Sequence, residues 1–237
     1  MRNNAVARVL ASVSIAGLAT AVVATVVGHI GLGPGYDPLK LTVSDYALSN
    51  RGMTIEIAMV ALAFGAVALL AGLRAAGARV RGLPTVLISI WSVGLLIAAI
   101  IPTDPIGATT MSTAAYVHRY ASVTAFVALP IAAAVLAARF GALGPTWSRL
   151  VSTIRRLCVA CAFGVALLWY VAFPGGRAMM GLVERGLIGV EIIILAVLSI
   201  SAFRLAGTRI ANATPPPTDP VAVEAVSAPE LAGSRRP

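Results

Sequence analysis

The chain has 237 residues, of which 59% are hydrophobic and only 11% are charged. Soluble globular proteins are typically about 45–50% apolar and about 25% charged, so this composition excludes a soluble enzyme, a disordered protein and a disulfide-rich secreted module. The net charge of +9 does not indicate nucleic-acid binding, because the basic residues lie in short segments between long apolar runs. The composition predicts an integral membrane protein with several spans.

Six apolar runs are long enough to cross a bilayer as α-helices. Each holds about 18–22 residues, close to the roughly 20 that a helix needs to span about 30 Å of hydrocarbon. None alternates polar and apolar residues as the strands of a membrane barrel do. We therefore predict an all-α transmembrane domain over residues 1–206, a bundle of six transmembrane helices. The spans are expected at residues 9–30, 53–73, 83–101, 120–138, 153–173 and 186–203.

The first run has a second interpretation, a cleaved signal peptide, because Arg2 and Arg8 precede it and small residues follow it. Its apolar stretch is longer than the usual 7–15 residues of a signal peptide, and no sharp cleavage signature precedes Gly28. The length favours a span that is retained.

The basic residues predict the orientation of the six spans. Cytoplasmic loops of membrane proteins carry an excess of arginine and lysine. Thirteen arginines lie on the side of the two termini, so both termini are expected in the cytoplasm. The Arg-rich, Lys-poor composition is typical of GC-rich bacterial genes. Together with the six predicted spans, it indicates a multi-pass protein of the bacterial cytoplasmic membrane. The outer side holds five basic residues: Lys40, Arg51, Arg119, Arg177 and Arg185.

Two connecting segments differ from the spans in composition. Residues 207–237 combine a proline run at 215–217 with small residues and scattered acids, so we expect a disordered cytoplasmic tail. The outer loop at residues 31–52 begins with Gly-Pro-Gly, which ends the first helix. Ser44 precedes Asp45 and is a candidate N-cap for a short interfacial helix that ends at Gly52. A plain capped turn is the alternative.

Ionisable residues gather at the outer ends of the spans. Glu56 lies about one turn inside the second span and Glu191 one or two turns inside the sixth, where a carboxylate is costly unless it is paired or faces a wet cavity. The inner halves of the spans carry no acid, so we expect a chamber that opens outward and not a through-pore. The expected ligand-binding cluster comprises Ser44, Asp45, Glu56, Asp104, His118, Arg119, Arg177, Glu184, Arg185 and Glu191.

His118 can take part in more kinds of chemistry than any other residue of this cluster. An unperturbed histidine, with a pKa near 6.5, can bind a metal, transfer a proton or change charge between pH 5 and 8. The alternative is an interfacial histidine that is hydrogen-bonded to a neighbouring carboxylate or to a lipid headgroup. The chain has 2 histidines, fewer than most zinc sites use, so we assign no metal, although carboxylates can hold a hard cation.

Three segments carry a resemblance to a known family: YDPLKLTVSDYALSNRG at 36–52, IPTDPIGATTMSTAAYVHRY at 101–120, and GLVERG at 181–186. Together they resemble an uncharacterised prokaryotic membrane family that is catalogued as domain of unknown function 998. The resemblance covers about residues 9–203. It implies a six-helix inner-membrane protein, and it implies no activity.

Three functions remain open on the sequence. The first is a binding protein or enzyme whose outward-facing pocket holds a lipid headgroup, a cell-envelope intermediate, an anionic small molecule or a cation. The second is a small proton- or ion-coupled transporter, against which the lack of ionisable groups at mid-membrane argues. The third is a structural or interaction protein without a ligand, whose charges pair with one another. The sequence assigns no catalytic residue, cofactor or oligomeric state, and the lipid bilayer is the one partner it predicts.

Overall fold

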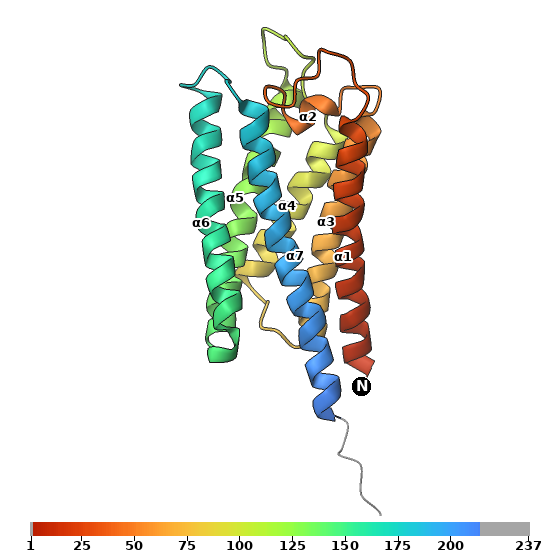
Figure 1. Ribbon diagram of the computed structural model, residues 1–237, viewed down its shortest axis with the longest axis vertical. Coiled ribbons are helices and arrows are strands. Elements are labelled where there is room, and N and C mark those ends of the chain that lie inside the picture. The colour runs from red at the N-terminus through yellow and green to blue at the C-terminus, as the bar shows by residue number, and fades with distance from the viewer. Residues whose placement is uncertain (1, 214–237) are drawn as a thin grey trace, which may run out of the picture.

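The computed structural model describes residues 2–213, which form six long helices, one short α-helix and one 3₁₀ turn (Figure 1). The short elements are α2 (Val43–Tyr46) and η1 (Pro145–Trp147). The long helices are α1 (Arg2–His29), α3 (Gly52–Ala75), α4 (Leu83–Ile100), α5 (Thr113–Gly141), α6 (Ser148–Ala172) and α7 (Met180–Ala213).

The all-α prediction is confirmed, and all six long helices are long and apolar enough to cross a membrane. Several helices extend beyond the apolar runs, because polar residues continue the helix outside the hydrocarbon. α5 begins at Thr113, where the side chain of Ser112 accepts a hydrogen bond from the backbone N–H of Ala115 and caps the helix. α7 continues past residue 207 to Ala213, and residues 214–237 of the expected tail lie outside the described residues.

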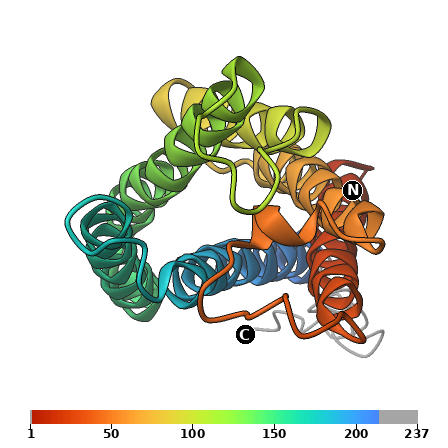
Figure 2. The same cartoon turned by 90° about the horizontal axis from the view of Figure 1, so that it is seen from above.

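The six long helices form a closed ring in chain order (Figure 2). Each helix packs against its neighbours in the sequence, and α7 closes the ring by packing against α1. Small residues bring α1 and α3 close together, since a Cβ added at Gly17 would lie 2.8 Å from the carbonyl oxygen of Ala61. Such close approaches of small residues are a common means of helix association in membranes.

The bundle has two chemically different ends. The α2 end carries α2 and the loops at residues 30–51, 101–112 and 173–179, and the terminal end carries residue 2, residue 213 and the loops at 76–82 and 142–147 (Figure 1). All six acidic residues within 2–213 lie in the half of the bundle nearer the α2 end: Asp37, Asp45, Glu56, Asp104, Glu184 and Glu191. The assignment of the terminal end to the cytoplasm stays a prediction.

Candidate functional site

The short helix α2 lies across one end of the ring and is fixed by a reciprocal cap. The side chain of Thr42 accepts from the backbone N–H of Asp45 at 3.2 Å, and the side chain of Asp45 accepts from the backbone N–H of Thr42 at 2.7 Å. This capping box satisfies two backbone donors that the start of a helix leaves unpaired. A short helix exists here, but Thr42 caps it and Ser44 lies inside it. It ends at Tyr46 and not at Gly52, which is the first residue of α3. The Thr-x-x-Asp spacing is the signal in the sequence for this cap.

Tyr46 fixes the other end of α2 in the bundle. Its side chain is 1% exposed, its ring stacks on His29 with centroids 4.1 Å apart, and its hydroxyl donates to the carbonyl of Tyr36. The guanidinium of Arg185 lies over the same ring, 4.9 Å from its centroid. Burial raises the pKa of Tyr46, so the hydroxyl stays protonated and remains a donor.

Arg185 holds the long loop that leads into α2. Its Nη1 donates to the carbonyl oxygens of Pro38, Leu41 and Gly181 at 2.8, 2.6 and 2.9 Å. Its Nη2 lies 2.8 Å from Nε2 of His29. Since arginine has no acceptor, that histidine nitrogen must accept. The four contacts commit this guanidinium to the protein, although the sequence suggested it as an anchor for a ligand.

Glu184 and His118 tie α2 to the transmembrane helices. Oε2 of Glu184, a 7% exposed residue on α7, accepts from the backbone N–H of Val43 at 2.6 Å. His118 on α5 is 5% exposed, and its Nδ1 lies 2.7 Å from the carbonyl of Ile101. Because a carbonyl only accepts, Nδ1 donates there, and in the neutral ring Nε2 accepts from the hydroxyl of Ser44 at 2.9 Å. The partners of His118 are therefore a carbonyl and a hydroxyl rather than a carboxylate.

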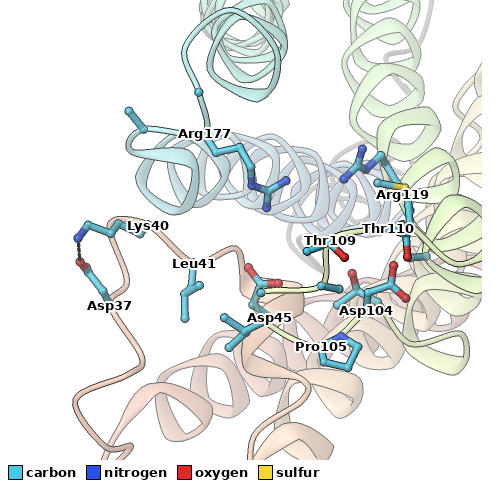
Figure 3. A pocket seen from close by; sticks show the side chains of 18 of the residues that line it. Asp37, Lys40, Leu41, Asp45, Asp104, Pro105, Thr109, Thr110, Arg119 and Arg177 are labelled. Carbon is cyan, nitrogen blue, oxygen red and sulfur yellow. Dashed lines mark ion pairs between the residues drawn. The ribbon is translucent and has the colours of Figure 1, made fainter.

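A pocket of about 820 Å³ opens above α2 (Figure 3). It lies between the loops at the α2 end and the start of α5, and four residues of the expected cluster line it: Asp45, Asp104, Arg119 and Arg177. Figure 3 shows the two guanidinium groups pointing toward each other across the pocket, with the two carboxylates along one side. Within residues 2–213, neither arginine forms a salt bridge, whereas Lys40 and Asp37 pair at 3.6 Å at the rim.

Asp104 organises one wall of this pocket. Its Oδ2 accepts from the backbone N–H of Ser112 at 2.9 Å, and the hydroxyl of Ser112 caps α5. The hydrogen bonds from Ser112, with a smaller contribution from nearby Arg119, hold the pKa of Asp104 below its usual value. Asp104 therefore stays ionised and fixes the loop that leads into α5.

The opposite wall holds a strained segment of backbone. Arg177 and Met179 have φ angles of 63° and 59°, in the left-handed region that residues other than glycine rarely occupy. Such conformations cost on the order of 1–3 kcal/mol each and cluster at functional sites. The backbone N–H of Arg177 donates to the carbonyl of Val171 at 2.8 Å, which holds the strained turn in place.

A second cavity, of about 250 Å³, lies below α2 within the ring. Its lining is mostly apolar, and four residues of the expected cluster take part in it: Ser44, Glu184, Arg185 and Glu191. Glu191 is 3% exposed, and its Oε2 accepts from Nε1 of Trp91 at 3.2 Å. Oε1 of Glu191 is buried without a hydrogen-bond partner among the described residues. Trp91 was not among the residues suggested by the sequence.

The structure thus divides the predicted cluster into two. α2 separates the four residues of the upper pocket from the four of the lower cavity, and His118 bonds to α2 between them. Glu56 lies in neither, because it is exposed on the outer face of α3 and forms no hydrogen bond or ion pair within residues 2–213. The neighbouring Ile55 faces the interior, and one residue turns a helix by about 100°.

Residues 14–201 match a family model described as protein of unknown function (DUF998). The chain belongs to this family. No curated protein and no solved structure matches the chain. The match covers all of the residues that build the upper pocket and the lower cavity, so the site of this DUF998 protein lies wholly within the family domain. The six candidate spans indicate residence in a lipid bilayer.

Among residues 2–213, no group of three or more histidine, cysteine, aspartate or glutamate side chains is placed to hold a metal ion. The pocket brings together the guanidinium groups of Arg119 and Arg177 and the carboxylates of Asp45 and Asp104, with the Lys40–Asp37 pair at the rim. Guanidinium groups bind phosphate and carboxylate oxygens through two parallel hydrogen bonds. Carboxylates accept hydrogen bonds from hydroxyl or ammonium groups. The arrangement suits a ligand that carries an anionic group beside a hydrogen-bond donor.

Proposed function

We propose that the pocket above α2 binds the phosphate or carboxylate of a lipid headgroup or of a small cell-envelope molecule, on the outer face of a bacterial cytoplasmic membrane. The observation that carries this proposal is the pair Arg119 and Arg177. They come from α5 and from the loop before α7, face one pocket, and lie outside salt-bridge distance of any described carboxylate. Two unpaired guanidinium groups on opposite walls form a clamp for one anion.

The carboxylates give the pocket a second specificity. Asp45 and Asp104 line the pocket and bond to backbone N–H groups, so each keeps a fixed position. A phosphate ester that also carries an ammonium or hydroxyl group complements both the arginines and these acids. Phosphoethanolamine and glycerol 3-phosphate have this chemistry and are soluble mimics of lipid headgroups.

Binding is favoured over transport because the acidic groups stop near one end of the bundle. In residues 2–213, all acidic side chains lie toward the α2 end, and the lower cavity is mainly apolar. A permeating ion needs polar groups along the whole path to replace its hydration shell. The outward orientation rests on the excess of arginine at the terminal end.

The test is a titration of the purified full-length protein with phosphoethanolamine and with glycerol 3-phosphate by calorimetry. The Arg119→Gln/Arg177→Gln variant should bind at least roughly 10-fold more weakly, since a hydrogen bond to a charged group contributes about 1.5–3 kcal/mol. Arg51→Gln is the matched control, because Arg51 lies at the same end but does not line the pocket. Equal affinity of the double variant and the control would refute the proposal.

A further inference from the structure

A pocket of about 650 Å³ that is lined by arginines, the basic pocket, lies at the terminal end, away from α2. Four arginines line it: Arg74 from the end of α3, Arg79 and Arg81 from the α3–α4 loop, and Arg139 from the end of α5. Residues 2–213 place no acidic side chain at this end of the bundle. The four charges therefore lie close together without a protein carboxylate to neutralise them, which favours an anion between them.

The hydrogen bonds of these arginines shape the pocket rather than fill it. Nη1 of Arg139 donates to the carbonyl oxygens of Arg79 and Arg81, at 2.7 and 2.8 Å, and so holds the α3–α4 loop against α5. Nη2 of Arg74 donates to Oγ1 of Thr85 at 2.9 Å, and Thr85 in turn donates to the carbonyl of Val80. All of these acceptors are neutral, so the pocket keeps its full positive charge.

An apolar groove of about 810 Å³ begins at the same threonine. It runs between α4 and α5, with Thr85 at one end and the exposed side chains of Val86 and Val93 along it. At the floor of the groove, Gly94 lets α4 and α5 pack closely, because a Cβ added at Gly94 would lie 2.8 Å from the carbonyl oxygen of Ala121. The groove follows α4 to Ile97, about 18 Å at 1.5 Å per residue, and its α5 side is formed by residues 113–124. It therefore runs through the roughly 15 Å of hydrocarbon in the leaflet at the terminal end and past the middle of the bilayer.

We propose that the basic pocket and the groove form one binding site for an anionic phospholipid of the leaflet at the terminal end. The phosphate lies among Arg74, Arg79, Arg81 and Arg139, and one acyl chain lies along the α4–α5 groove. Thr85 joins the two parts, because it bonds to Arg74 and also lines the groove. The groove is long enough to hold an acyl chain, so the site favours a lipid over a free phosphate ion. The positive charge of the four arginines favours an anionic lipid over a zwitterionic one. This site is separate from the pocket above α2 and does not depend on it.

The test measures how much phosphatidylglycerol the full-length protein retains, relative to phosphatidylcholine, when it is released from mixed nanodiscs into a native mass spectrometer. Arg79→Gln/Arg81→Gln removes two charges but leaves the backbone carbonyls that Arg139 uses, so the loop stays in place. We expect the preference for phosphatidylglycerol to fall roughly 30-fold. The matched control is Arg155→Gln/Arg156→Gln, two arginines of α6 near the same end that line a different pocket.

A second arm separates a lipid from a free anion. Ser89→Phe places a ring in the groove and should reduce retention of phosphatidylglycerol without changing the binding of inorganic phosphate. Val159→Phe, at a position 71% exposed on α6, controls for added bulk on the outer surface of the bundle. Equal retention in the two arginine variants would overturn the proposal. Unchanged retention in Ser89→Phe, together with tight binding of inorganic phosphate alone, would show a site for free anions and would also overturn it.

Discussion

At the scale of single residues, Glu191 and Glu56 show how rotation about a helix axis decides the environment of a carboxyl group. Both lie within transmembrane helices toward the α2 end. Glu191 faces the interior and accepts a hydrogen bond from Trp91, whereas Glu56 is exposed on the outer face of α3. A buried carboxyl group that loses its donor keeps the full cost of its desolvation.

Replacing Trp91 with phenylalanine tests this hydrogen bond. One aromatic ring remains in the core, but Oε2 of Glu191 loses its donor, so the lost hydrogen bond should lower the free energy of unfolding by about 1–3 kcal/mol. The smaller side chain adds the cost of the volume it leaves unfilled. Trp169→Phe is the matched control, because Trp169 is 62% exposed and should change the stability little. Unfolding in mixed micelles, followed by circular dichroism, measures both variants. Equal stability of the two variants would show that the bond to Glu191 contributes nothing.

At the scale of elements, the short helix α2 and the start of α5 are held by side chains that bond to backbone groups. Thr42 and Asp45 cap α2, while Asp104 and Ser112 fix the entry to α5. These bonds fix the positions of Asp45 and Asp104, which line the upper pocket. The pocket therefore depends on local caps as much as on the packing of the bundle, and the Asp104 contact depends on pH.

The pH dependence of Asp104 follows from its lowered pKa in the folded state. Hydrogen bonds from Ser112 stabilise the ionised form of Asp104. This contribution to the stability of the fold is complete above the pKa of an aspartate in the unfolded chain, near 3.9. It is lost as the pH falls through the lower pKa of Asp104 in the folded state. The difference in melting temperature between wild type and Asp104→Asn should stay constant from pH 7 to about pH 5 and shrink below about pH 4. Asp37→Asn is the control. It leaves the Ser112 bonds in place, so its melting temperature should fall on acidification as much as that of the wild type. A difference that grows on acidification would contradict this assignment.

At the scale of the whole molecule, the hydropathy pattern was enough to predict six helices, since about 20 apolar residues can cross a membrane in one conformation only. The gathering of acidic residues toward the α2 end also follows from the sequence, because alternate loops lie at the same end. The division of that cluster by α2 could not be predicted, since it depends on contacts between segments as distant as Ser44 and His118, or Val43 and Glu184. Nor could the exposure of Glu56, because depth in a span does not fix rotation about its axis.

The central claim is that Arg119 and Arg177 clamp an anionic group in the pocket above α2. An electron cryo-microscopy map of the full-length protein, in nanodiscs of bacterial lipids with phosphoethanolamine added, tests it most directly. The account predicts density for the phosphate between the two guanidinium groups, within about 3 Å of both. The same density should be absent from a map of the Arg119→Gln/Arg177→Gln variant. An empty pocket at saturating phosphoethanolamine, or arginines paired with Asp45 and Asp104 instead, would contradict the claim.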